Sequence, residues 1–287
     1  MHNPITVLKN IWRQQLKANR QLNDMTIRMN NQVEQRLLFQ SYGQLNKQSF
    51  DSVGFREYSQ TNEDGILLYI FSQIGFGDRR CLDIAFATPF GSNVTNLLSN
   101  WGFTGLLIEG KSLEASRIFF NEHPDTRIHP PKLVKAWITK KNINSLIKKN
   151  SITGNIDLLS LDVDGVDYWL WESLTVASPR VVVLEFANYI PADKSLTVPY
   201  KDDFVRSDIH LDFMGASLKA FIKLAKKKGY TFVGTNLYGF NAFFVRNDQP
   251  LDWYSPVSIK QALSHHQAQE GLKNRWPSVK DLPWIEV

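Results

Sequence analysis

The sequence predicts an α/β fold on a mostly parallel sheet, preceded by a helical arm. Three observations predict it. From about residue 51, short apolar runs alternate with amphipathic stretches, the pattern of strand–helix–strand units with right-handed crossovers. The run Arg180–Glu185 (RVVVLE) is β-branched in its middle, as in a strand buried on both faces. Residues 4–40 contain one proline, Pro4, and no glycine, which is typical of a long helical region.

The first 50 residues form the predicted arm, as one helix or a helix pair. Pro4 suits an early helical position. Apolar residues form two stripes at helical spacing, Val7, Leu8, Ile11, Trp12 and Leu16, then Met25, Met29, Val33 and Leu37. The arm holds seven basic and two acidic residues, so it accounts for the whole net charge of +5. We expect it to pack on a second subunit, giving a homodimer, or to cover the mouth of an active site.

The strands and helices after the arm follow in regular order. Strands are predicted at 80–86, 104–109, 132–138, 157–162, 180–185, 231–235 and 241–245. Helices are predicted at 66–74, 93–101, 113–122, 142–149, 168–174 and 216–228. The last two strands have no helix between them, so they form a hairpin around Gly239 and one of them runs antiparallel. Five parallel strands followed by an antiparallel insertion is the layout of class I methyltransferases.

Composition excludes several classes of protein. Cys81 is the only cysteine, which excludes a disulfide scaffold and favours a reducing compartment. No apolar run of 18 residues and no signal peptide is present, so we expect a soluble cytoplasmic protein without a membrane partner. Residues 51–287 are electrically neutral, which disfavours nucleic acid as a partner because phosphate binding needs clustered bases.

Acidic residues end four of the five predicted parallel strands: Asp83, Glu109, Asp162 and Glu185. The carboxyl ends of parallel strands meet at one edge of a sheet, where ligands bind. A single such acid could equally cap the next helix. The set as a whole favours a ligand site, because clustered carboxylates are costly unless a ligand or metal uses them.

Glu109 is the sharpest candidate for binding a nucleotide-like cofactor. An acid at the tip of the second strand can accept both hydroxyls of a ribose. Trp137, after the third strand, either stacks on an adenine ring or belongs to the core. The turn after the first strand has Ala85 and Ala87 where dinucleotide-binding turns use glycine. A pyrophosphate cradle, and with it a nicotinamide dinucleotide, is therefore disfavoured.

The loop after the fourth strand carries further acids. Its sequence, Asp162-Val-Asp-Gly-Val-Asp167, resembles the start of a calcium loop, but Ser173 stands where an EF-hand needs glutamate. A divalent cation such as Mg²⁺, held by Asp162, Glu185 and Asn188, is the more plausible metal site.

A general base is expected from the same loop. Asp162 or Asp164 is the predicted base, with His210, in a loop over the same sheet edge, in reserve. The pair His265-His266 lies in a polar stretch of sequence and is interpreted as a surface feature.

Three stretches of the chain resemble the FkbM-type family of S-adenosylmethionine-dependent methyltransferases. They are Tyr58–Ile66 (YSQTNEDGI), Ile156–Tyr168 (IDLLSLDVDGVDY), and Phe213–Leu218 with Lys228–Tyr230 and Asn241–Arg246. The resemblance covers roughly residues 55–248 and implies a class I methyltransferase fold with O-methylation of a hydroxyl on a sugar or natural-product scaffold. The predicted domains are then an arm (1–50), a methyltransferase-like domain (51–250) and a C-terminal tail packing on it (251–287).

The resemblance also implies roles for individual residues. Cofactor contacts are expected at Gln60, Glu63, Asp83, Ala85, Asn93, Glu109, Trp137 and Asp162. Asp64 would close the cofactor side together with Gln60 and Glu63, and the long loop 189–212 would recognise the acceptor. The alternative is a methyltransferase-fold protein whose altered turn supports another reaction, or only the binding of a small molecule.

Overall fold

The computed structural model describes residues 4–287, with side chains from Arg13 onward except that of Ser207. The predicted apolar positions Val7, Leu8, Ile11 and Trp12 therefore lie outside the described side chains. The chain divides into two compact units, Met1–Gln44 and Leu45–Val287, which are described separately.

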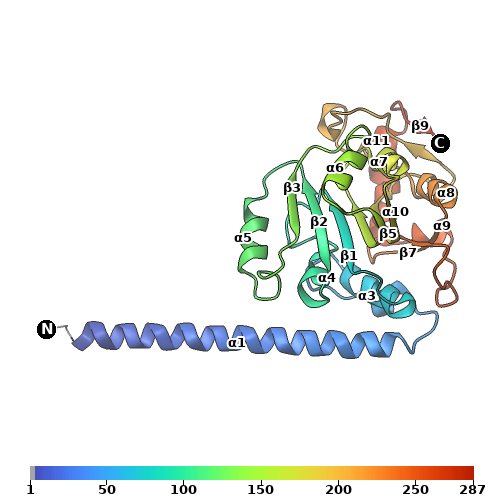
Figure 1. Cartoon of the computed structure of the whole chain (residues 1–287). Coiled ribbons are helices and arrows are strands. Elements are labelled where there is room, and N and C mark those ends of the chain that lie inside the picture. The colour runs from blue at the N-terminus through green and yellow to red at the C-terminus, as the bar shows by residue number, and fades with distance from the viewer. Residues whose placement is uncertain (1–3) are drawn as a thin grey trace. The chain divides into compact units, whose positions relative to one another are not determined.

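The first unit consists of a single long helix, α1 (Pro4–Tyr42), drawn in blue in Figure 1. The predicted helical arm is thus confirmed as one continuous helix of 39 residues. None of the helices that the structure describes has the length and apolar character needed to cross a bilayer.

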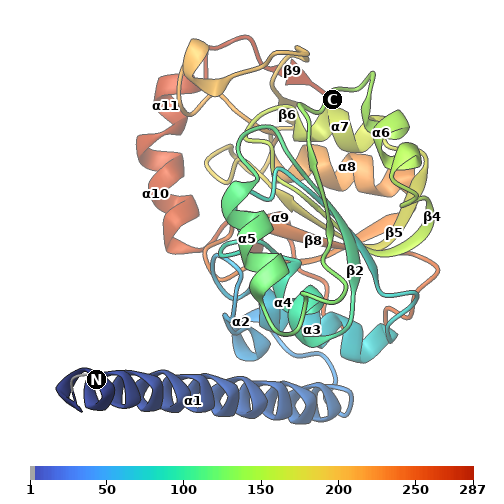
Figure 2. The same cartoon turned by 60° about the vertical axis from the view of Figure 1, so that its left-hand side comes forward.

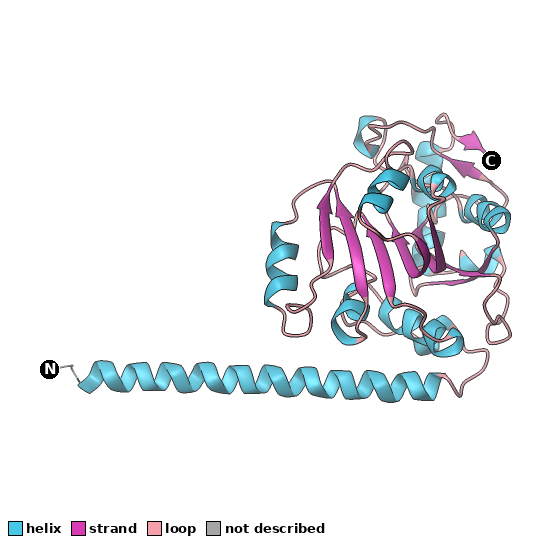
Figure 3. Cartoon of the chain, viewed as in Figure 1, coloured by secondary structure: helices cyan, strands magenta, loops and turns pink. Residues whose placement is uncertain are grey.

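The second unit is built on a seven-stranded sheet in the order β3-β2-β1-β4-β5-β8-β7, shown in magenta in Figure 3. Its strands are β1 (Arg80–Ile84), β2 (Thr104–Glu109), β3 (Lys132–Lys135), β4 (Gly154–Leu161), β5 (Ala177–Glu185), β7 (Tyr230–Thr235) and β8 (Asn241–Arg246). Strand β8 pairs antiparallel with both of its neighbours, and the other pairings are parallel. This is the predicted class I methyltransferase layout, which the strand order confirms.

Helices lie on both faces of the sheet. The helices of this unit are α2 (Phe50–Val53), α3 (Glu63–Ile74), α4 (Thr95–Asn100), α5 (Glu114–Glu122), α6 (Ile143–Lys149), α7 (Asp167–Ser173), α8 (Leu218–Lys228), α9 (Ile259–Ala262), α10 (His266–Asn274) and α11 (Trp276–Val279). Two short strands, β6 (Leu196–Thr197) and β9 (Ile285–Glu286), pair apart from the main sheet, and η1 (Arg206–Asp208) is a 3-10 turn.

One face of the sheet is covered by α6, α7 and α8, which lie together in both Figure 1 and Figure 2. Ile147, Trp171 and Phe221 from these helices share one buried cluster with Leu82 and Ile84 of β1. Residues of β1 alternate between the two faces, so Asp83 points away from this cluster. The core therefore holds the carboxyl ends of the central strands in a fixed arrangement.

The third strand is shorter than predicted. Strand β3 ends at Lys135, whereas the apolar run predicts strand to residue 138. The N–H of Ala136 still donates to the Glu109 carbonyl at 3.0 Å, but the chain then leaves the sheet. The Trp137 indole N–H reaches the Asp202 carbonyl at 2.7 Å, which holds this segment against another loop.

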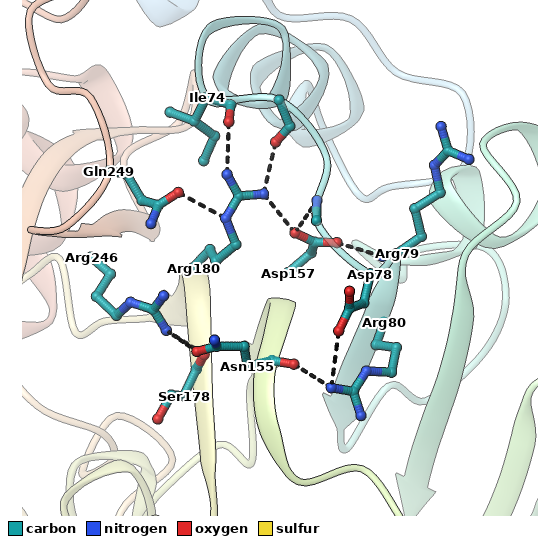
Figure 4. A network of polar contacts seen from close by, with 12 residues as sticks. Ile74, Asp78, Arg79, Arg80, Asn155, Asp157, Ser178, Arg180, Arg246 and Gln249 are labelled. Atoms are coloured by element: carbon teal, nitrogen blue, oxygen red, sulfur yellow. Dashed lines mark hydrogen bonds and ion pairs between the residues drawn. The ribbon is translucent and has the colours of Figure 1, made fainter.

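The amino ends of β4 and β5 carry a buried ion pair, shown in Figure 4. Asp157 is fully buried, and its carboxylate accepts the N–H groups of Gly77 (2.8 Å) and Arg79 (2.7 Å). Arg180 donates to the same carboxylate at 2.8 Å and to the Ile74 carbonyl at the end of α3 at 2.7 Å. The pair thereby closes the otherwise unpaired carbonyl end of α3.

Candidate active site

The turn after β1 keeps a glycine-like conformation although alanines occupy it. Ala85 has φ 63° and Ala87 has φ 54°, the left-handed region that costs a residue with a Cβ roughly 1 kcal/mol. Hydrogen bonds hold both positions, from Ala85 N–H to the Ile108 carbonyl (2.7 Å) and from Ala87 N–H to Glu109 Oε2 (3.1 Å). The tight turn is therefore formed although Ala85 and Ala87 stand where dinucleotide-binding turns use glycine.

Glu109 ends β2 beside that turn and is buried. Its Oε1 accepts the Lys111 N–H at 2.7 Å and its Oε2 accepts the Ala87 N–H at 3.1 Å. These bonds fix the carboxylate in place. Because each carboxylate oxygen has two acceptor positions, one on each oxygen is left over for a ligand.

Trp137 lies next to this acid and is not a core residue. A Cβ added at Gly110 would come within 3.1 Å of the Trp137 ring, so only glycine admits the indole this closely. The side chain is 53% exposed. Of the two readings that the sequence allows, a core tryptophan is wrong, and an aromatic surface beside Glu109 is present.

Asp83 and Asn93 lie buried behind the turn. Ser92 donates to Asp83 Oδ2 at 2.7 Å, and Asn93 donates through Nδ2 to Ser160 at 3.2 Å. Burial, aided by the charges of Asp162 and Glu109, raises the pKa of Asp83 to about 7. Within the part of the chain that the structure describes, the buried Oδ1 of Asn93 has no hydrogen-bond partner. An unsatisfied buried acceptor of this kind suits a donor from a ligand.

Three carboxylates meet where β4 and β5 end. One oxygen each from Asp162, Asp164 and Glu185 lie within 4.8 Å of one another. Burial raises the pKa of Glu185 well above its usual range, and the negative charge of Asp162 raises it further. Burial also raises the pKa of Asp162, which shares a hydrogen bond with Glu185.

The loop that presents Asp162 is shaped by the first residue of α7. Asp167 accepts the N–H groups of Val163 (2.7 Å) and Gly165 (2.9 Å). Asp164, at φ 57°, turns outward and pairs with Arg206 at 2.8 Å. Asp162 is thus the member of this loop that stays engaged with Glu185.

His210, the reserve base, is poorly arranged for that task. Its Nδ1 accepts the Asp212 N–H at 3.1 Å. In the neutral imidazole the proton then resides on Nε2, which leaves no free ring nitrogen to accept another proton. His210 is also not among the residues that line the pocket described below.

Glu63 and Asp64, expected near the cofactor, are occupied by the protein itself. Glu63 is fully buried and accepts four hydrogen bonds of 2.7–3.0 Å, two from Thr61 and one each from Asn236 and Asn241. Asp64 Oδ2 accepts three consecutive backbone N–H groups, those of residues 57–59, and the Ser59 hydroxyl. Both acids therefore shape the segment before α3, and Glu63 Oε1 is fully occupied. Among the described residues, Glu63 Oε2 keeps one acceptor position and the buried Oδ1 of Asp64 has no hydrogen-bond partner.

A pocket of about 600 Å³ opens beside Glu185. Its polar lining includes Gln60, Glu185, Asn188, His266, Glu270 and Arg275. Helix α10 supplies one wall and approaches closely, because a Cβ added at Gly271 would lie 2.9 Å from Tyr189 Cβ. Of the predicted metal ligands, Asn188 shares this pocket with Glu185.

The sequence interpretation missed the contribution of α10. It treats residues 251–287 as a polar tail with His265-His266 on the surface, whereas His266 lines the pocket. The signal was present but weak. Ala268 and Gly271, three residues apart, are the buried positions of α10, so the inward face consists of two small residues that no hydrophobic pattern reveals.

Comparisons with known proteins give only distant likenesses. No protein-family model matches the chain, and no curated protein sequence matches it. Similar solved structures include the pyocyanin biosynthetic protein PhzM (13% identity, 62% of this chain and 53% of that chain, TM-score 0.37). An O-methyltransferase family protein from Burkholderia thailandensis is 12% identical over 64% of this chain and 58% of that chain, with a TM-score of 0.38.

A third similar structure is the glycopeptide N-methyltransferase MtfA complexed with sinefungin (11% identity, 68% of this chain and 93% of that chain, TM-score 0.39). The chain spans only about half the length of PhzM. The fold assignment therefore rests on the strand order and directions described above.

Proposed function

We propose that the protein is an S-adenosylmethionine-dependent methyltransferase that methylates a hydroxyl group of a sugar or natural-product scaffold. The observation that carries the proposal is the position of Glu109, a buried carboxylate with acceptor positions to spare at the tip of β2. In nucleotide-binding sheets an acid at this point binds the ribose hydroxyls. The resemblance to FkbM-type methyltransferases supports the same role.

The neighbouring residues fit the rest of such a cofactor. The exposed ring of Trp137 lies beside Glu109 and offers a surface for adenine. The unsatisfied Oδ1 of Asn93 and the carboxyl of Asp83 suit the ammonium group of a methionine moiety. No phosphate is involved, so the alanine-containing turn is not required to cradle one.

The chain must orient the acceptor hydroxyl and remove its proton, because the bound cofactor supplies a methyl group that is already activated. Asp162 is the best-placed base. Its raised pKa brings proton affinity closer to neutral pH, where a general base works best. Asp164 is paired with Arg206 and His210 with Asp212, so neither competes for this role.

The pocket beside Glu185 is the proposed acceptor site. The Arg275 guanidinium is neutralised by Asp212 at 2.7 Å and lies 4.1 Å from the centre of the Tyr189 ring. With two further acids, Glu185 and Glu270, in the lining, a phosphorylated or carboxylated acceptor is disfavoured. Hydroxyl groups suit the many polar side chains of this lining.

A divalent cation is a further part of the proposal. Asp162, Asp164 and Glu185 offer the hard oxygen ligands that Mg²⁺ prefers, with Asn188 in the same pocket as Glu185. Bound there, the ion would lower the pKa of an acceptor hydroxyl. If the ion is needed, treatment with EDTA abolishes methyl transfer and added Mg²⁺ restores it; unchanged activity in EDTA would remove the metal from the proposal.

Isothermal titration with S-adenosylhomocysteine tests the cofactor assignment. We expect binding to the wild type and at least 10-fold weaker binding to Glu109→Gln. Glu114→Gln, in the exposed first turn of α5, is the matched control and should bind as the wild type does. Absence of binding to the wild type would favour a module that only shares the fold. Binding without methyl transfer to any acceptor would favour another reaction in the same pocket.

A further inference from the structure

We propose that α1 pairs with the α1 of a second copy of this chain through an apolar stripe, which we call the α1 stripe. The stripe consists of Leu22, Met25, Met29, Val33 and Leu37, and each of these side chains is 51–63% exposed. This inference is independent of the proposed enzymatic function.

The spacing of the stripe is that of a helix–helix seam. Its members follow one another at intervals of three or four residues, and Leu22 and Val33 are eleven residues apart. An eleven-residue repeat corresponds to 3.67 residues per turn, close to the natural 3.6, so Leu22 and Val33 lie nearly on one line along the helix axis. The other members lie within about 60° on either side of that line. In the sequence, the same eleven-residue step extends back from Leu22 to Ile11.

Residues within and beside the stripe allow close contact between helices. Ala18 lies on the same face by helical spacing and is small. The Thr26 hydroxyl donates to the Leu22 carbonyl at 2.9 Å. Because this hydroxyl is satisfied within its own helix, Thr26 presents its methyl group to a partner.

The charges of α1 favour self-pairing. At 100° per residue, six charged residues lie on the side of the helix opposite the stripe: Arg13, Lys17, Arg20, Asp24, Arg28 and Glu34. Arg36 is the exception, because it falls between Met25 and Met29 around the helix and so lies within the stripe. Two copies joined through the stripe therefore keep their excess basic charge apart. A face that inserts into lipid is usually broader and richer in aromatic residues than these five side chains.

The contact is also large enough for a dimer. If each stripe residue buries on the order of 100 Å², the ten side chains of two helices bury about 1,000 Å², the lower limit for a specific interface. A symmetric dimer uses the same patch on both subunits, as a single self-complementary stripe requires.

Light scattering coupled to size exclusion on the full chain tests the proposal at tens of micromolar protein. We expect the wild type to have twice the mass of one chain. Met25→Glu should weaken dimerisation at least 10-fold, because it places two charges in the seam. Ile27→Glu is the matched control, since Ile27 is equally exposed (58%) but lies on the opposite face of α1, and it should remain dimeric.

Disulfide trapping gives a second readout that does not weaken the seam. Met25→Cys should form a covalent dimer under mild oxidation and Ile27→Cys should not. The one natural cysteine, Cys81, is fully buried, so the wild type should form no disulfide and is the negative control. A monomeric wild type, or equal behaviour of the two positions, would overturn the proposal. Sedimentation of a monomeric wild type with phosphatidylserine vesicles would assign the stripe to a lipid surface instead.

Discussion

The acids at the two edges of the sheet have opposite environments. At the amino edge, Asp157 is paired with Arg180 and with two backbone N–H groups, so its charge is neutralised within the protein (Figure 4). At the carboxyl edge, Asp162 and Glu185 have mainly each other as partners, and burial raises the pKa of both. At the amino edge, donor groups of the protein fill the carboxylate and stabilise the fold. At the carboxyl edge, the carboxylates have few donor groups or positive charges beside them.

This difference separates structural acids from candidate functional ones. A carboxylate whose lone pairs are filled by backbone and arginine donors stabilises the fold and has nothing left for a ligand. Carboxylates without a cation raise the free energy of the folded protein, which is typical of sites that await a ligand, metal or proton. The predictions below test this distinction, in order of decreasing expected effect.

The largest expected effect is on catalysis. Asp162→Asn should lower methyl transfer about 10³-fold, because it removes the base while keeping the shape of the side chain. The free energy of unfolding should change by less than about 1 kcal/mol. Turnover of a hydroxylated acceptor and urea denaturation together check this. Glu172→Gln, which loses only a partly exposed pair with Lys140, is the control and should keep its activity; full activity in Asp162→Asn would refute the assignment.

Asp157→Asn should show the reverse pattern. It leaves the buried Arg180 without its counter-charge, which we expect to lower the free energy of unfolding by about 3 kcal/mol. Affinity for S-adenosylhomocysteine should be unchanged, since Asp157 contacts Gly77 and Arg79, which precede β1, and not the turn that follows it. Asp78→Asn breaks only an exposed pair with Arg80 and should change stability by less than about 0.5 kcal/mol. Equal effects of the two substitutions would contradict the contrast.

The carboxyl edge also predicts how stability depends on pH. Burial raises the pKa of Asp83 to about 7, so between pH 4 and 7 the folded chain binds a proton that the unfolded chain has lost. Stability therefore falls as pH rises through this window. For Asp83 alone the loss between pH 5 and 8 is about 3 kcal/mol. Urea denaturation at both pH values should show a smaller difference in Asp83→Asn than in the wild type.

The smallest effect concerns the turn after β1. Ala85→Gly removes the strain of a left-handed alanine and should stabilise the protein by up to about 1 kcal/mol. Ala115→Gly, at an exposed position in α5, should destabilise it by a similar amount. Opposite shifts in melting temperature for the two variants would support a strained turn. Destabilisation by both substitutions would show that Ala85 is not strained.

Much of the sheet could be predicted from sequence because its strands are short apolar runs between turns. Strand β2 has the predicted bounds, so Glu109 is placed correctly at its tip. Strand β3 was predicted too long because Ala136, Trp137 and Ile138 continue an apolar run after the last ladder bond. Whether a chain leaves a sheet depends on partners such as Asp202, 65 residues from Trp137.

The site was harder to predict for the same reason. A sequence shows which acids end the strands, but it does not show which hydrogen-bond donors occupy their carboxylate oxygens. The sequence predicts that Glu63 contacts the cofactor. In the structure, Asn236 and Asn241, more than 170 residues away, donate hydrogen bonds to it. The pocket wall on α10 was missed because small residues such as Gly271 carry no hydrophobic pattern, although they allow the closest approach.

The pairing of β1 has a consequence for how this chain folds during its synthesis on the ribosome. Leu82 pairs with Leu106 on one side and with Leu159 on the other. The centre of the sheet therefore stays open along one edge until residues up to Leu161 have emerged. A nascent chain arrested before that point exposes an apolar strand edge of the kind that aggregates. We expect chaperone dependence to be greatest for truncated chains that end between residues 110 and 160.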